Sequence, residues 1–162
     1  HRNVRACVGI CWLMVITSLR SQDTSQTKPE FDYDSYESTT LDAMVENPPS
    51  IQEGMDIFFK KLQFDATLVS KPRECTAVIV GKVLKMQGIS EAPTVSHCVT
   101  IRSEKGVTAE VFIQDVIAKD LKRAVKVGGR FRVFALYLYY SAQSKNLGIL
   151  INAFNEPSAN KG

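Results

Sequence analysis

Few residues in this 162-residue chain have the types and spacing that catalysis requires. His97 is the one histidine beyond residue 1, and no carboxylate lies close to it in the sequence. The chain has no Cys-x-x-Cys pair, no His-Glu-x-x-His motif and no glycine-rich loop of the kind that holds phosphate. We therefore expect His97 to be an exposed strand residue, and we expect no enzymatic activity, no metal site and no cofactor.

Basic side chains are better candidates for a functional surface, because lysine and arginine attract acidic proteins, sulfated glycans and nucleic acids. Six of them fall in segments with strand or turn character: Lys82, Lys85, Arg102, Lys105, Arg130 and Arg132. Phe112 is interleaved with them. We predict a ligand-binding surface made by these side chains.

Charge is divided unevenly along the chain. Residues 22–58 contain nine acidic residues and one basic residue, whereas residues 59–162 contain eight acidic and sixteen basic residues. Residues 22–49 are also rich in Ser, Thr and Pro, so we predict an acidic disordered segment there. Within it, Tyr33 and Tyr36 stand among acids and suit sulfation, while Ser35 suits phosphorylation. A plain solvated linker and a segment that folds back on the basic surface are the alternatives.

The first residues have the pattern of a secretory leader. Arg2 and Arg5 precede an apolar run from Ala6 to Ile16, and small polar residues follow. The run is short for a membrane span, which needs about 20 apolar residues. We predict a signal peptide at 1–21, no transmembrane segment and a secreted, extracellular protein. A buried core segment is the alternative.

Removal of such a leader would leave two cysteines, Cys75 and Cys98. In an oxidising compartment two cysteines suggest one disulfide. The strands predicted below, however, place Cys98 opposite Leu84. Nine residues of strand at about 3.3 Å each would then hold the two cysteines far beyond the roughly 7 Å between Cα atoms that a disulfide tolerates. The sequence leaves both a bond and two free thiols open.

An amphipathic helix is predicted at 50–64, directly after two prolines. Ser50 and Glu53 have the spacing of a capping box. The apolar residues behind them recur at helical spacing: Ile51, Met55, Phe58, Phe59 and Leu62. We expect this helix to cover part of a core, with binding to a partner or a membrane surface as the alternative.

Residues 65–157 have the pattern of strands and turns that is typical of a small β-rich domain. Residues 158–162 are expected to form a tail. Runs of β-branched residues predict strands, and a change to helical spacing predicts one helix before a Gly-Gly turn. The expected strands are 75–86, 95–103, 107–113, 130–140 and 147–154, with the helix within 114–124. Gly81 is expected to bend the first strand.

The order β-β-β-α-β-β with a glycine-bent first strand resembles the oligonucleotide/oligosaccharide-binding (OB) fold, a five-stranded Greek-key barrel. The stretch 126–133 also resembles the turn into the fourth strand of that fold. The resemblance covers about residues 75–154 and implies an all-β domain leaning to α+β. In a barrel, one face of strand 130–140 is expected to point inside: Phe131, Val133, Ala135, Tyr137 and Tyr139. On the other face, Phe134, Leu136 and Leu138 would be bare in water. We expect the helix at 50–64 to cover these three residues from outside.

The segment from Cys75 to Val83 resembles the start of netrin-like domains, the OB-type modules of tissue inhibitors of metalloproteinases and of several matrix proteins. The resemblance implies a secreted, non-enzymatic interaction module of the extracellular matrix that binds acidic extracellular proteins or sulfated polysaccharides. Those inhibitors bind the protease metal through an amino-terminal cysteine, and Cys75 lies far from that place, so inhibition is not implied. The alternative is single-stranded nucleic-acid binding, which uses cations and stacked aromatics in an OB groove.

Overall fold

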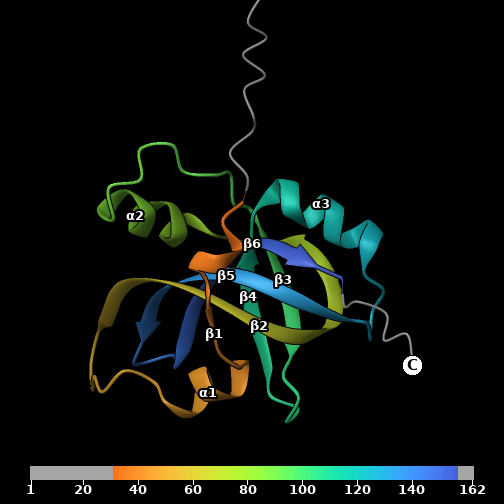
Figure 1. Ribbon diagram of the computed structural model, residues 1–162. Helices are drawn as coiled ribbons and strands as arrows, with labels where there is room; N and C mark the ends of the chain where they lie inside the picture. The colour runs from red at the N-terminus through yellow and green to blue at the C-terminus, as the bar shows by residue number, and fades with distance from the viewer. Residues whose placement is uncertain (1–30, 157–162) are drawn as a thin grey trace, which may run out of the picture. The chain divides into compact units, whose positions relative to one another are not determined.

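The computed structural model describes residues 31–156, which form one six-stranded sheet with a few short helices (Figure 1). The strands are β1 (Glu37–Ser38), β2 (Met55–Glu74), β3 (His97–Arg102), β4 (Thr108–Ile113), β5 (Arg130–Ser141) and β6 (Asn146–Asn155). The helices are η1 (Tyr33–Ser35), α1 (Leu41–Glu46), α2 (Val78–Met86) and α3 (Asp115–Ala124). The expectation of a mostly β domain is confirmed. The predicted signal peptide at 1–21 and tail at 158–162 lie outside the described residues.

The sheet closes into a ring because β2 has a partner on each side. The strand order is β1-β2-β3-β4-β6-β5, and β5 also pairs with β2. The first part of β2 is antiparallel to β5, from Met55 opposite Ser141 to Thr67 opposite Arg130. Its second part is antiparallel to β3. One long strand with several register shifts therefore joins the two halves of the ring.

The helix predicted at 50–64 is wrong, because most of that segment belongs to the 20-residue strand β2. Residues 61–68 alternate between exposed or half-buried and buried positions, and Leu62, Phe64, Ala66 and Leu68 face the ring interior. This two-residue period and the pairing with β5 outweigh the helical spacing of the apolar residues before it. Gly54, at a φ of 78°, provides the turn that opens the strand.

The strand predicted at 75–86 is also wrong, because residues 78–86 form helix α2. The β-branched residues of the run lower helix propensity by only a few tenths of a kcal/mol each. Burial of Val80, Val83 and Leu84, which share one helix face, outweighs that cost. Gly81 therefore lies in a helix and bends no strand.

Helix α2 covers the outer face of β5, the role expected for the helix at 50–64. Leu136 and Leu138 of β5 form one apolar cluster with Val80, Val83 and Leu84 of α2. Figure 1 shows α2 outside the ring of strands. The prediction that a helix covers this face is confirmed for Leu136 and Leu138, with α2 in place of the segment 50–64. For Phe134 it is wrong, because the rings of Tyr33 and Tyr36 pack against that residue, with centroids 4.7 and 5.6 Å away.

The main core fills the inside of the ring. Alternate residues of β5 (Phe131, Val133, Ala135 and Tyr137) lie in it, as predicted. Tyr139 instead packs in the outer cluster, because the pairing of β5 with β6 shifts register between residues 137 and 139. Helices α1 and α3 add buried residues to the main core at opposite ends of the ring (Figure 1).

The acidic segment predicted at 22–49 to be disordered is folded from residue 32 onward. Strand β1 runs parallel to β2, with Glu37 opposite Leu62. The Thr40 hydroxyl accepts a hydrogen bond from the Ala43 N–H at 3.0 Å and caps α1. Leu41 and Met44 are buried in the main core. These apolar residues anchor a stretch whose average composition is that of a linker.

The structure joins Cys75 and Cys98 in a disulfide, with 5.7 Å between their Cα atoms. The register of β2 and β3 places Arg73 opposite Cys98, so Cys75 follows at the end of β2. The objection from strand geometry fails because residues 78–86 are helical and Leu84 is not the partner of Cys98.

Candidate functional site

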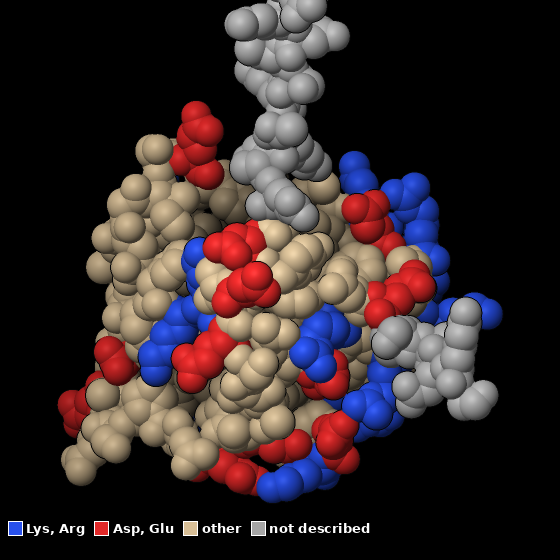
Figure 2. Space-filling model, viewed as in Figure 1, with Lys and Arg blue, Asp and Glu red and all other residues tan. Residues whose placement is uncertain are grey.

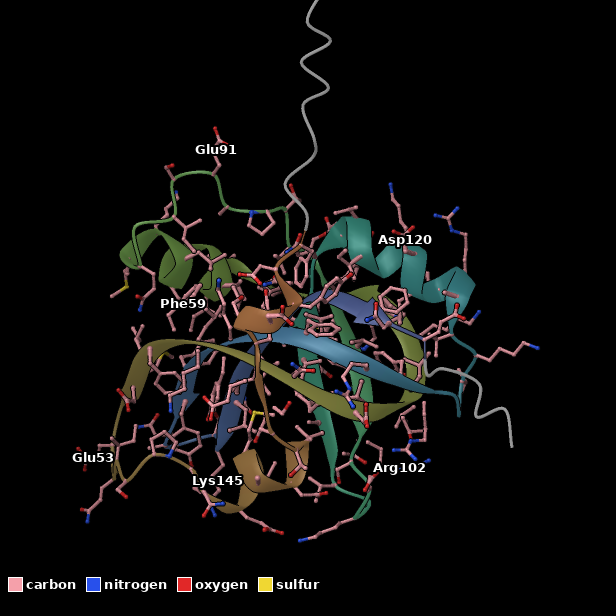
Figure 3. All side chains as sticks on the ribbon, viewed as in Figure 1. Glu53, Phe59, Glu91, Arg102, Asp120 and Lys145 are labelled. Atoms are coloured by element: carbon pink, nitrogen blue, oxygen red, sulfur yellow. A yellow bond between two sulfur atoms is a disulfide. The ribbon has the colours of Figure 1, made fainter. Side chains whose placement is uncertain are left out.

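The six basic residues predicted to bind ligand lie in two separate places. Lys82 and Lys85 are on the exposed side of α2. The other four are at the end of β3, in the turn after it and at the start of β5. In Figure 3, Arg102 lies on the side of the view opposite α2. The structure therefore does not join the six into a single surface.

Acidic side chains pair with three of the four cations near the turn. Asp65 of β2 lies opposite Arg132 and accepts two hydrogen bonds from its guanidinium, at 2.6 and 3.2 Å. Glu104 accepts from Arg130 at 2.5 Å, and Glu46 of α1 accepts from Lys105 at 3.0 Å. The hydrogen bond to Asp65 raises the pKa of the Arg132 guanidinium against the effect of burial. Carboxylates of the protein itself therefore match three of the six predicted cations. The other three, Lys82, Lys85 and Arg102, form no ion pair with a described residue.

A second group of cations, absent from the sequence-based set, forms no ion pair with any described residue. We call it the α3 lysine cluster: Lys71, Lys119, Lys122 and Lys126. All four residues are exposed. In Figure 2, blue side chains line the right-hand edge of the molecule, where α3 lies.

Helix α3 positions this cluster because its two faces differ. Ala118 and Leu121 are buried on the core side. Lys119 and Lys122 are three residues apart in the helix, which places them near one another on its outer side. Lys126 follows the end of the helix at Ala124. The Lys71 ammonium donates to the Lys122 carbonyl at 3.4 Å, which brings a lysine of β2 to the C-terminal end of the helix. Cations at that end are favoured by the helix dipole, so the cluster also suits the helix.

The sequence carried a signal for this cluster. The stretch from Lys119 to Lys126 contains three lysines and Arg123 within eight residues. Arg123 is the member that forms an ion pair, with Asp120 at 2.6 Å. Figure 3 shows Asp120 projecting outward from α3. The sequence-based set was drawn from segments with strand or turn character, so it contains no residue of α3.

Ser96, His97 and Asp115 form a hydrogen-bonded cluster that connects the start of β3 to the start of α3. Asp115 Oδ1 lies 2.8 Å from both His97 Nδ1 and the Ser96 backbone N–H, and Oδ2 accepts from the Ser96 hydroxyl at 2.7 Å. His97 begins strand β3, as predicted, but its side chain is only 22% exposed because Asp115, distant in sequence, contacts it. Desolvation raises the pKa of Asp115, but the hydrogen bonds from His97 and Ser96 outweigh it and leave that pKa lowered.

The same three residue types occur in catalytic triads, but the arrangement differs. In a triad the hydroxyl and the carboxylate lie at opposite ring nitrogens of the histidine. Here the Ser96 hydroxyl donates to Asp115 and lies 3.2 Å from Nδ1, the same nitrogen that contacts Asp115. Ser96 is therefore not placed as the nucleophile of a triad, and the cluster connects two elements of the fold.

The residues predicted to be modified differ in exposure. Tyr33 and Ser35 are exposed. Tyr36 is 7% exposed, its ring packs edge-on against Phe134 with centroids 5.6 Å apart, and its hydroxyl accepts from Asn152 at 3.2 Å. Burial raises the pKa of the Tyr36 hydroxyl. Among the three, Tyr33 and Ser35 are the ones that a modifying enzyme could reach.

In residues 31–156, no group of three or more His, Cys, Asp or Glu side chains is arranged to hold a metal ion. None of the helices described in that range is long and apolar enough to cross a membrane. Comparison of the sequence with models of known protein families and with curated proteins gives no match.

Proposed function

We propose that this chain is a secreted, non-enzymatic binding module of the OB type that acts in the extracellular matrix. Strands β2 to β6 form a closed ring, and α3 lies between the third and fourth of them in sequence. This order supports assignment to the OB class, whose members bind extended ligands on their outer surface. Since one fold serves many functions, the ligand is argued from the surface.

The proposed ligand is a polyanion, either an acidic polysaccharide such as a sulfated glycan or an acidic extracellular protein. The observation that carries this proposal is the α3 lysine cluster, whose four exposed ammonium groups form no ion pair with the described residues. Unpaired cations grouped on one surface attract and concentrate anions, whereas cations already matched by carboxylates do so weakly.

Heparin chromatography of the full chain tests the proposal. We expect the double variant Lys119→Gln/Lys122→Gln to elute at clearly lower salt than the unmodified protein. Its slope of log affinity against log salt should fall by about one for each lost contact. Glutamine has nearly the helix propensity of lysine, so α3 should persist.

The matched control is Lys82→Gln/Lys85→Gln, which removes the same charge from helix α2. It should elute close to the unmodified protein. Equal losses in the two variants would show that net charge alone governs retention. A larger loss in the control would locate the ligand on the sequence-predicted surface of α2.

Single-stranded nucleic acid is the second polyanion considered. Stacking of bases needs exposed aromatic side chains beside the cations. Phe112, the aromatic residue expected in that role, is partly buried and packs against the outer apolar cluster. Competition with a single-stranded oligonucleotide in the heparin assay distinguishes the two ligands, since displacement at equal charge would favour nucleic acid.

Secretion is part of the same proposal, and the Cys75–Cys98 disulfide supports it because disulfides persist in oxidising compartments. Full-length chain expressed in cultured animal cells should appear in the medium with both cysteines oxidised, as measured by thiol labelling after denaturation. Retention in the cytosol with two reactive thiols would contradict the proposal.

A further inference from the structure

Ser35 is an exposed serine at the point where the folded acidic segment joins the ring. It ends the three-residue helix η1, none of whose residues is buried. The next residue, Tyr36, is buried against Phe134, and strand β1 begins directly after it. The Ser35 hydroxyl donates a hydrogen bond to the Asp32 carbonyl at 2.8 Å, in an exposed place. An enzyme can therefore reach this hydroxyl, although the residues that follow are fixed to the ring.

A lysine of β2 lies beside that hydroxyl. The Lys61 ammonium donates to Ser35 Oγ at 3.5 Å, and it lies 5.8 Å from the centre of the Tyr36 ring. Lys61 is exposed, and within residues 31–156 it forms no ion pair with a carboxylate. A negatively charged group attached to Ser35 would therefore meet a cation that is already in place.

Acidic side chains flank Ser35 and stay available to an enzyme that binds there. Asp32, Asp34 and Glu37 are exposed, and none of them forms an ion pair with a residue that the structure describes. A kinase whose substrate groove is basic would recognise such flanks by charge complementarity. Local opening of η1 for such an enzyme costs little, because this helix buries no residue.

We propose that a serine kinase that recognises acidic flanks phosphorylates Ser35, and that the phosphate fixes the acidic segment to β2 through Lys61. Ser35 Oγ forms a bond to the γ-phosphorus of ATP while the bond from that phosphorus to the departing ADP breaks, and the hydroxyl proton passes to a base of the kinase. The hydrogen bond to the Asp32 carbonyl is lost, but that exposed carbonyl can accept from water instead. The phosphate gains a charge-assisted hydrogen bond from Lys61, which offsets repulsion by the neighbouring carboxylates.

Peptide mapping by mass spectrometry tests the site on the full chain expressed in cultured animal cells. Protein from the medium and protein from the cell pellet are analysed separately, so that a failure of secretion is distinguished from a failure of phosphorylation. We expect a phosphoryl group on Ser35 that alkaline phosphatase removes, whereas a sulfate ester on Tyr33 would resist that enzyme. The absence of phosphate from Ser35 in both fractions would overturn the proposal.

Amide hydrogen exchange tests the contact with Lys61. The Thr39 N–H donates to the Gln63 carbonyl at 2.9 Å, so exchange of this amide reports release of the segment from β2. In the phosphorylated chain it should exchange more slowly than in the phosphatase-treated chain, by roughly two- to fivefold at low salt, as expected for an exposed ion pair. The difference should shrink as salt is added.

Two variants identify the partner of the phosphate. Lys61→Gln should abolish the slowing. Lys60→Gln is the matched control and should keep it, because the Lys60 ammonium lies over the Phe58 ring, 5.4 Å from its centre. Equal slowing in the two variants would overturn the role of Lys61, and so would faster exchange after phosphorylation. These measurements are independent of heparin retention, because they involve neither α3 nor its lysines.

Discussion

Asp115 shows at the scale of one residue how this fold joins its parts. Its carboxylate satisfies Ser96 and His97 at the start of β3, while its backbone N–H donates to the Thr94 carbonyl at 3.0 Å. One side chain thereby fixes the angle between a strand and the helix that carries the lysine cluster. Because its pKa is lowered in the folded protein, ionised Asp115 stabilises the fold above its ordinary pKa of 3.8. That contribution is lost as the pH falls through the lowered value.

The variant Asp115→Asn should therefore lower the free energy of unfolding at neutral pH by about 1–2 kcal/mol, since an amide cannot accept the same set of hydrogen bonds. Its stability should also fall less steeply than that of the unmodified protein as acid is added. Chemical denaturation at several pH values measures both effects.

Asp120→Asn is the control for that experiment. Asp120 is an exposed carboxylate on the same helix, paired with Arg123, and exposed pairs contribute little. A change within about 0.5 kcal/mol is expected. If the two variants behaved alike, the cluster around Asp115 would have no special role in stability.

At the scale of elements, the second half of the chain is the predictable half. The strands β3 to β6 and the helix α3 lie within two residues of the expected bounds, because each is bounded by a turn or by a change of period. The errors concern β2 and α2. The alternation of Leu62, Phe64, Ala66 and Leu68 is visible in the sequence, but a capping-box pattern before it favoured a helix. In α2, a run of β-branched residues concealed the helical spacing of Val80, Val83 and Leu84.

Two glycines test these assignments. Gly148 of β6 lies under the ring of Tyr139, where an added Cβ would come within 2.2 Å of ring carbons. Gly148→Ala should therefore lower the free energy of unfolding by about 1–3 kcal/mol, the usual cost of overpacking. An added Cβ at Gly81 meets nothing within 4 Å. Gly81→Ala should raise the free energy of unfolding by about 0.5–1 kcal/mol, because alanine is the better helix former.

Thermal or denaturant unfolding of the two alanine variants measures both changes against the same reference. A destabilising Gly81→Ala would contradict the helix at 78–86. A neutral Gly148→Ala would show that Tyr139 moves aside at little cost, and the tight packing between β5 and β6 would then be adaptable.

At the scale of the whole molecule, the sequence predicts that the candidate site is basic but does not identify the residues that form it. The excess of basic over acidic residues after residue 58 can be counted directly in the sequence. The carboxylates that pair with the predicted cations are distant in sequence, however, and meet them only in the folded ring. Arg132, for example, finds Asp65 across the β2–β5 pairing. The two carboxylates of α3 have other partners, since Asp115 contacts His97 and Asp120 pairs with Arg123, so neither pairs with the lysines of that helix.

The long strand β2 also constrains how the protein is made. Its partner β5 leaves the ribosome only after β3, β4 and α3, so a nascent chain carries β2 for some time with one edge bare. Strands as distant in sequence as β2 and β5 pair slowly, and an unpaired strand edge can pair with another chain. A chain truncated before β5 would therefore aggregate and would not fold into a smaller functional domain.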